Sequence, residues 1–173
     1  MVVYHGTNVP IEQFDPALTV DGGLHFGTAK QAAIRAGVTG RNLVPVYLHI
    51  ENPRRSRDAG GAWKAKIRSA KGAGFDGIVY TNRYEGIDAV TVDRALREGV
   101  DLDKLTDAEF RKYAPEARDS YIAFHPRQVK SAVGNAGAYR RADLDMTDRK
   151  SLATDALDWL ARCGAIPKAK ARA

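Results

Sequence analysis

The chain of 173 residues has a single cysteine, Cys163, so it can form no internal disulfide and no cysteine-based zinc cluster. It also has no apolar run approaching the length of a bilayer crossing, which predicts a protein without a membrane partner. Residues 1–5 lack the basic and apolar segments of a secretory leader. We therefore expect a protein of a reducing compartment, either the cytoplasm or a host cytoplasm into which it is delivered.

Two common nucleotide-binding motifs are missing. No Gly-x-Gly-x-x-Gly follows a predicted strand and no Walker-type loop occurs, which disfavours Rossmann-type binding and nucleotide hydrolysis. His49 and His125 have no metal-ligand spacing to a second His, Asp or Glu, so the sequence predicts no metal site. The composition, 44% hydrophobic and 28% charged, is that of a globular domain long enough to bury its own core.

The formal net charge is +6, which favours acidic partners such as nucleic acid, phosphates or an acidic protein surface. The alternative is a merely basic protein without such a partner. Arg54, Arg55 and Arg57 form a short basic cluster. This cluster is either a solvated loop or a source of charge-assisted contacts to a pyrophosphate or an acidic target.

Local patterns divide the chain into a domain at residues 1–140 and a C-terminal part at 141–173, with a helix near 148–162 and a basic tail. Residues 87–118 are dominated by charges and contain the capping box of Thr106 and Glu109, which predicts a helical insertion. Pro45 lies in a predicted strand at 43–50 and indicates that this is an edge strand or that the strand starts there. The remaining predictions are strands at 2–4, 43–50, 78–80, 121–124 and 129–133, helices at 29–36 and 62–70, and a turn at 52–55.

Three short motifs carry the chemical argument. Splitting the bond between nicotinamide and ribose needs a pocket that grips the carboxamide, stacks on the pyridine ring and stabilises positive charge on the ribose. A His-Gly-Thr turn suits the first task, because glycine lets the backbone approach the amide while imidazole and hydroxyl reach ribose oxygens. A Gly-x-His-Phe-Gly turn supplies a flat ring. The motifs are His5-Gly6-Thr7, Gly23-Leu24-His25-Phe26-Gly27-Thr28, and Ser120-Tyr121-Ile122-Ala123-Phe124 followed by Gln128-Val129.

Together these motifs resemble the ADP-ribosyltransferase superfamily, in its diphtheria-toxin and poly(ADP-ribose) polymerase-like branch. The resemblance is greatest to the small domains of phage and mobile-element polyvalent proteins, and it spans residues 2–139 with an insertion. It implies an α+β fold in which two split antiparallel β-sheets form an NAD cleft flanked by helices. It also implies NAD+ as a substrate and a protein or nucleic acid as the acceptor.

The resemblance assigns the cofactor-binding residues. His5 takes the position of a histidine that contacts the adenosine-side ribose, with Thr7 beside it, and Gly6 takes that of a glycine that contacts the nicotinamide amide. His25 replaces a tyrosine that stacks on nicotinamide, a role that an imidazole can also perform. The other residues expected to bind NAD+ are Gly23, Phe26, Gly27 and Tyr84.

The resemblance also places Ser120 where the family has its catalytic glutamate, and a serine cannot offset oxocarbenium charge as a carboxylate does. Two nearby acids are candidates to replace it, Glu85 and Asp119. We favour Glu85, because Asp119 would project to the opposite face of a regular strand from Ser120.

The function predicted first is that of an NAD+-dependent mono-ADP-ribosyltransferase, a glycosyltransferase acting as a phage or mobile-element toxin or effector. His5, His25, Ser120 and either Glu85 or Asp119 form its expected catalytic group. The alternatives are a catalytically degenerate domain that binds NAD, ADP-ribose or a macromolecule, and an enzyme resembling NAD-dependent RNA 2′-phosphotransferases. The last arises because some relatives of that type have a histidine in place of the tyrosine.

Overall fold

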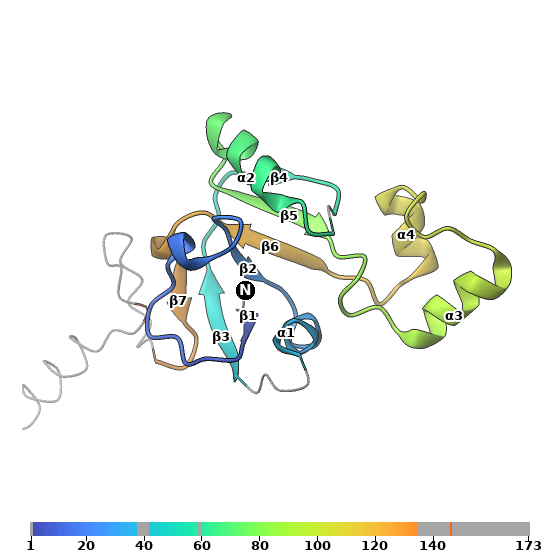
Figure 1. Cartoon of the computed structure of the whole chain (residues 1–173), viewed down its shortest axis with the longest axis horizontal. Helices are drawn as coiled ribbons and strands as arrows, with labels where there is room; N and C mark the ends of the chain where they lie inside the picture. The colour runs from blue at the N-terminus through green and yellow to red at the C-terminus, as the bar shows by residue number, and fades with distance from the viewer. Residues whose placement is uncertain (1, 38–41, 59, 135–145, 147–173) are drawn as a thin grey trace, which may run out of the picture.

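The computed structural model describes residues 2–37, 42–58, 60–134 and 146, and it has the expected mixed α+β architecture (Figure 1). Its strands form two separate sheets. One sheet has the order β1 (Val2–Thr7), β3 (Asn42–Leu48), β7 (Val129–Ser131). The other has the order β2 (Leu24–Phe26), β6 (Asp119–Ala123), β5 (Gly77–Thr81), β4 (Pro53–Arg55).

Within the sheets every pairing is antiparallel except that of β4 with β5. The sheets are joined by an isolated bridge between Tyr4 of β1 and Gly27, which follows β2. The Tyr4 N–H donates to the Gly27 carbonyl at 2.8 Å, and the Gly27 N–H donates to the Tyr4 carbonyl at 3.0 Å. The two sheets therefore meet at a short seam and diverge on either side of it.

Helix α1 (Ala29–Ala36) begins and ends as the sequence predicts. Thr28 and Gln31 form a capping box at its start, and Gly37, with a φ of 73°, ends it. α1 lies so close to β1 that a Cβ on Gly6 would fall 1.9 Å from the Ala32 carbonyl oxygen. The glycine of the His-Gly-Thr motif is therefore needed for the packing of α1 on β1.

Helix α2 (Trp63–Gly72) connects β4 to β5 and covers one face of the second sheet (Figure 1). Its buried residues Trp63, Ile67 and Ala70 pack with Ile78 and Tyr80 of β5 and Ile122 of β6. None of the helices in the described part of the chain combines the length and apolar character that a membrane crossing requires.

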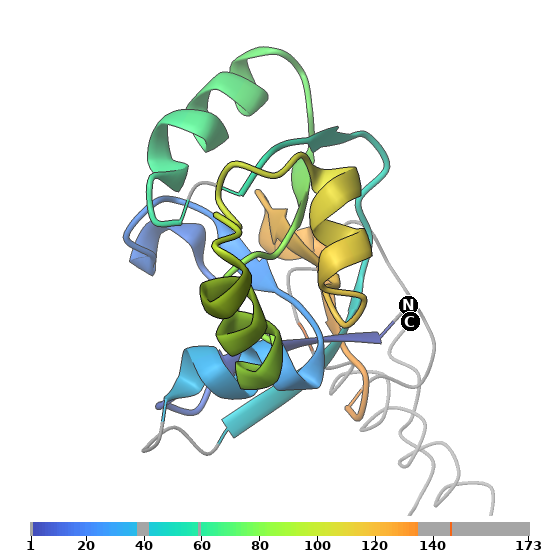
Figure 2. The same cartoon turned by 90° about the vertical axis from the view of Figure 1, so that its right-hand side faces the viewer.

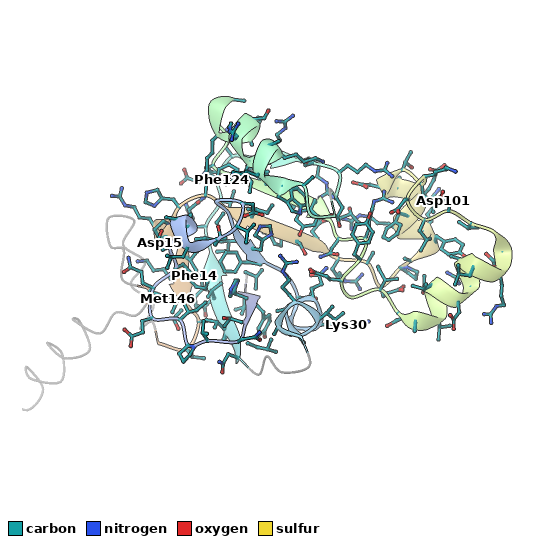
Figure 3. All side chains as sticks on the ribbon, in the orientation of Figure 1. Phe14, Asp15, Lys30, Asp101, Phe124 and Met146 are labelled. Atoms are coloured by element: carbon teal, nitrogen blue, oxygen red, sulfur yellow. The ribbon has the colours of Figure 1, made fainter. Side chains whose placement is uncertain are left out.

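A second core lies beneath the first sheet. Met146 packs in it, and the Ser131 N–H donates to the Met146 carbonyl at 2.9 Å, so the chain returns to β7 after residue 134. Figure 3 shows Phe14 beside Met146. Two short 3-10 turns lie in the connections between strands: η1 (Pro16–Leu18) between β1 and β2, and η2 (Pro126–Gln128) between β6 and β7. The core itself contains buried residues from both sheets. Its members are Val3, Phe14, Leu24, Phe26, Val46, Ala123, Val129 and Met146.

Between β5 and β6 the chain forms α3 (Ala89–Glu98) and α4 (Asp107–Tyr113), which project to one side of the two sheets (Figure 1) and face the viewer in Figure 2. Thr106 and Glu109 form the predicted capping box of α4. The buried guanidinium of Arg83 anchors this segment. It donates to the carbonyls of Leu102 and Leu105 at 2.8 and 2.9 Å, pairs with Asp107 and stacks 4.5 Å from the centre of the Phe110 ring.

Two local predictions are wrong. The predicted turn at 52–55 contains β4, an edge strand that begins at Pro53 and carries exposed arginines, as edge strands often do. Pro45 lies inside the central strand β3 rather than at an edge or a start. Opposite Pro45, the N–H and C=O of Tyr4 turn away toward Gly27, so β1 loses no hydrogen bond to the proline. On the other side Pro45 faces Ala132, just past the end of β7.

The predicted C-terminal helix at 148–162 and the basic tail lie outside the described residues, as does almost all of the predicted part at 141–173.

We expect Gly6→Ala to lower the free energy of unfolding by about 1–3 kcal/mol, because the new methyl group would overlap the Ala32 carbonyl. Urea unfolding followed by circular dichroism measures this change. The matched control is Gly72→Ala at the exposed end of α2, where an added Cβ meets nothing within 4 Å. Equal stability of the two variants would contradict the close packing of α1 on β1.

Candidate functional site

A cleft of about 510 Å³, counted out to its open mouth, lies at the seam of the two sheets. Tyr4 and Gly27, the residues of the bridge, line it together with residues from α1, β5, β6, the loop before α2 and the loop after β5. Residues from all three sequence motifs line it, among them Gly6, His25 and Ser120. The cleft is therefore the candidate functional site of this fold.

The residues singled out from the sequence divide between this cleft and other places. The cleft is lined by Gly6, His25, Phe26, Gly27, Tyr84, Glu85 and Ser120. Four others do not line the cleft, and their contacts position its walls or stabilise the sheets. These four are His5, Thr7, Gly23 and Asp119.

His5 supports the cleft from behind its wall. Its Nδ1 lies 2.8 Å from the carbonyl oxygen of His25, so Nδ1 carries the proton and Nε2 is left as an acceptor. The ring meets Phe14 edge-on, with centroids 5.2 Å apart, and lies 5.8 Å from the Phe26 ring. Burial lowers the pKa of His5 despite the hydrogen bond to His25. A neutral imidazole therefore fixes β2 against β1.

Thr7 and Gly23 have local structural tasks. The Thr7 hydroxyl exchanges hydrogen bonds with the backbone of Val9, at 3.1 and 3.2 Å. A Cβ on Gly23 would fall 2.5 Å from Ile122 and 2.8 Å from Ile67, so this glycine admits the close approach of α2 and β6.

His25 is held by an acid that sequence reasoning missed. Its Nε2 lies 2.8 Å from Oδ2 of Asp21, whose Oδ1 accepts from the Gly23 N–H at 3.0 Å. Burial alone would raise the pKa of Asp21, but the hydrogen bond and charge interaction with His25 leave that pKa below its usual value. Asp21 thus stays ionised and fixes both the tautomer and the plane of the His25 ring.

Two further aromatic rings complete the wall that His25 begins. The centroids of Trp63 and Tyr80 are 4.3 Å apart, and Trp63 meets His25 edge-on at 6.4 Å. Burial raises the pKa of Tyr80 far above its usual value, so its hydroxyl stays protonated and pairs with Ser120. Neighbouring rings are tilted by 41° and 70°, so the wall consists of separate aromatic faces at different angles.

Asn82 connects Ser120 to Glu85. Its Nδ2 donates to Oγ of Ser120 and to Oε2 of Glu85, each at 3.0 Å. Its Oδ1 accepts from the backbone N–H groups of Tyr84 and Glu85, at 3.1 and 2.8 Å. The buried amide of Asn82 therefore holds the loop after β5 in place and brings the Glu85 carboxylate beside Ser120.

The cleft contains charges of both signs. Nη1 of Arg35 on α1 lies 3.4 Å from Oε1 of Glu85, and 25% of the Glu85 side chain is exposed. Asp58 adds a second carboxylate to the lining, and its Oδ2 accepts from the Arg83 N–H at 2.9 Å. Glu85 is thus the carboxylate fixed at the centre of the lining, with one guanidinium facing it.

Asp119 lies on the opposite face of β6, as the alternation of strand side chains requires. Its carboxylate accepts two hydrogen bonds from Arg55 of β4, at 2.8 and 2.9 Å, and pairs with Arg111 of α4. Thr81 of β5 joins the same group through its hydroxyl. Asp119 therefore ties α4 to β4 and β6, away from the cleft.

Tyr84 stands at the cleft mouth with 56% of its surface exposed. Its hydroxyl donates to Oδ1 of Asp103 at 2.9 Å, and this bond is the main reason that the pKa of Tyr84 is raised. The ring thereby links the cleft to the segment that contains α3 and α4.

Sequence reasoning missed Asp21, Arg35, Trp63, Tyr80 and Asn82. Trp63 and Tyr80 look like ordinary core residues in sequence, and only the packing of α2 on β5 brings them to the cleft. Asn82 had a usable signal, because it stands three residues before Glu85 and can cap that turn. Among the described residues, no three His, Cys, Asp or Glu side chains gather in a way that could hold a metal ion.

Comparison with known families gives one result that covers most of the chain. Residues 1–139 match the family model described as ADP-Ribosyltransferase in polyvalent proteins. The comparisons with curated proteins and with solved structures gave no match.

The buried, neutral state of His5 predicts a pH dependence of stability. Since burial lowers the folded-state pKa below 6.5, the unfolded chain takes up the proton first. The contribution of His5 to the free energy of unfolding is complete above pH 6.5 and is lost as the pH falls through the folded-state pKa. Urea unfolding at several pH values should therefore show that wild type loses more stability below 6.5 than His5→Asn, whose amide can still donate to His25. If the stability of the two proteins fell equally with pH, this account of His5 would be contradicted.

Proposed function

The chain belongs to the family of ADP-ribosyltransferase domains in polyvalent proteins, and we propose that it is a mono-ADP-ribosyltransferase. In this proposal it transfers ADP-ribose from NAD+ to a protein or nucleic-acid acceptor. The observation that carries the proposal is the position of Glu85, whose carboxylate lies beside Ser120 through the shared amide of Asn82.

A carboxylate at this place compensates for the serine at the family's glutamate position. Ser120 is buried and its Oγ is bound by Asn82 and Tyr80, so it shapes the cleft and has no charge to offer. Glu85 reaches the same cleft from the neighbouring loop, is partly exposed and is paired loosely with Arg35. A fixed carboxylate is what a developing oxocarbenium ion needs, because its charge is in position before the reaction begins.

The remaining lining suits the nicotinamide half of NAD+. His25 and Trp63 offer flat rings for stacking, and Asp21 prevents the His25 ring from turning. Gly6 leaves the backbone of β1 open to the carboxamide. His5 acts from behind this wall, where its Nδ1 holds β2 and so keeps His25 and Phe26 in place.

The proposed reaction breaks the bond between ribose C1′ and nicotinamide N1. The electron pair of that bond leaves with N1, which becomes neutral, and positive charge develops on C1′ and the ring oxygen. The Glu85 carboxylate offsets this charge. A lone pair of the acceptor then forms the new bond to C1′, and the acceptor proton passes to solvent or to Glu85. Because Ser120 stands where the family has its glutamate, we propose a single transfer rather than chain elongation.

The first experiment measures nicotinamide release from NAD+ by purified protein, with host lysate as the source of acceptors. We expect release by wild type and a loss of about 100- to 1000-fold in Glu85→Gln, the usual cost of removing one electrostatic contact to the transition state. Binding of NAD+ to this variant should change little, because glutamine keeps the size of the side chain and the bond partners of Asn82.

Asp119→Asn is the matched control, since it removes the other candidate carboxylate without touching the cleft. We expect it to keep the wild-type rate and to melt at a lower temperature, because it loses the charge that pairs with Arg55 and Arg111. A rate that falls in Asp119→Asn but not in Glu85→Gln would overturn the assignment. NAD+ binding without nicotinamide release by wild type would instead favour the catalytically degenerate binding module.

A further inference from the structure

The positive charge of the chain is concentrated in one structural unit beside the cleft. Residues 54–71, which contain β4, the following loop and α2, carry seven lysines and arginines and one carboxylate, Asp58. Their net charge of +6 equals that of the whole chain, so the other residues sum to zero. We call this unit the basic surface. Its cations are Arg54, Arg55, Arg57, Lys64, Lys66, Arg68 and Lys71.

Six of these seven cations contact no carboxylate among the residues that the structure describes. Arg55, which pairs with Asp119, is the one member that contacts a carboxylate in the described part of the chain. Lys66 donates to the Arg57 carbonyl and Lys71 to the Gly22 carbonyl, contacts that orient their ammonium groups but leave their charge uncompensated. The charge of the basic surface is therefore available to a ligand.

Three of the cations form a stripe along α2. The buried face of the helix is Trp63, Ile67 and Ala70, and Lys64, Arg68 and Lys71 repeat the same spacing one residue further on. They are exposed and extend over about 10 Å of helix. Like charges at this spacing cost a helix about 0.2–0.5 kcal/mol per pair. Nothing in α2 offsets that cost, since the helix has no acidic residue.

The basic surface borders the cleft. Trp63, the first residue of α2, lines it, as do Asp58 and Gly60 in the loop between β4 and α2. Figure 1 shows α2 beside β4, the edge strand of the second sheet. The neighbouring segment, residues 86–118, has eight carboxylates and six cations and offers no such charge. A polyanion attracted to this protein therefore settles on the β4 and α2 side.

From these observations we propose that the basic surface binds the phosphodiester backbone of a nucleic acid. A row of cations with this spacing suits successive phosphates, and the surface-exposed positions of α2 carry no aromatic side chain for base stacking. Recognition is thus of the backbone rather than of the sequence. A strand held there is presented to the cleft as the acceptor, a consequence that rests on the proposed function, whereas the binding itself does not.

The test is the fluorescence anisotropy of labelled oligonucleotides titrated with the full chain at several salt concentrations, in the absence of NAD+. Separate arms with single-stranded DNA, RNA and duplex DNA identify the source of the backbone. The variant is Lys64→Gln with Arg68→Gln and Lys71→Gln, which keeps good helix formers in α2. The matched control makes the same charge change at Arg97, Lys104 and Lys112, exposed residues of the segment that contains α3 and α4.

We expect salt-dependent binding by wild type and by the control. The α2 variant should bind about ten-fold or more weakly at moderate salt, and its slope of log affinity against log salt should be shallower by about 2. The proposal is overturned by absent or salt-insensitive binding, by equal weakening of both variants, or by polyglutamate competing as well as nucleic acid. Circular dichroism melts confirm that both variants fold, and nicotinamide release, measured separately, decides the proposed function.

Discussion

The two backbone hydrogen bonds between Tyr4 and Gly27 hold one sheet against the other, and the cleft depends on this contact. Among the residues that the structure describes, they are the one strand pairing between the two sheets. Gly27 permits the bridge because any Cβ there would fall 2.5 Å from Oε1 of Gln31 and 3.1 Å from Oγ of Ser120. Tyr4 and Gly27 thus line the cleft at the seam, and its polar and aromatic side chains come from the elements around them.

Those walls depend on polar side chains that work in pairs. Asp21 fixes His25, and Asn82 fixes both Glu85 and Ser120. Gln31 caps α1 through Oε1 and reaches the Arg118 carbonyl through Nε2, so it ties the helix on one wall to the start of β6 on the other. Each buried amide or carboxylate has its hydrogen bonds supplied by neighbours, which holds the lining in place.

Much of this fold follows from local sequence. Thr28, Gln31 and Gly37 are sufficient to delimit α1, and the alternation of β6 separates Ser120 from Asp119. The errors came where tertiary context decides. Pro45 fits a central strand because Tyr4 bonds elsewhere, and β4 exists because β5 offers it a partner. The aromatic wall could not be predicted from the sequence, because Trp63 and Tyr80 reach the cleft from separate elements and no spacing in the chain relates them.

The segment between β5 and β6 has a closed base. The Asn82 N–H donates to the Arg118 carbonyl at 3.1 Å, which joins the two ends of the segment. The Arg83 guanidinium donates to the carbonyls of Leu102 and Leu105 inside it. Since its two ends are already joined, lengthening or exchanging the residues between Gly86 and Ala117 adds little loop-closure entropy. The strands on either side keep their register through such changes. The exposed positions of this segment can therefore change beside a cleft whose walls stay in place, provided that the carbonyls and the carboxylate that hold Arg83 are kept.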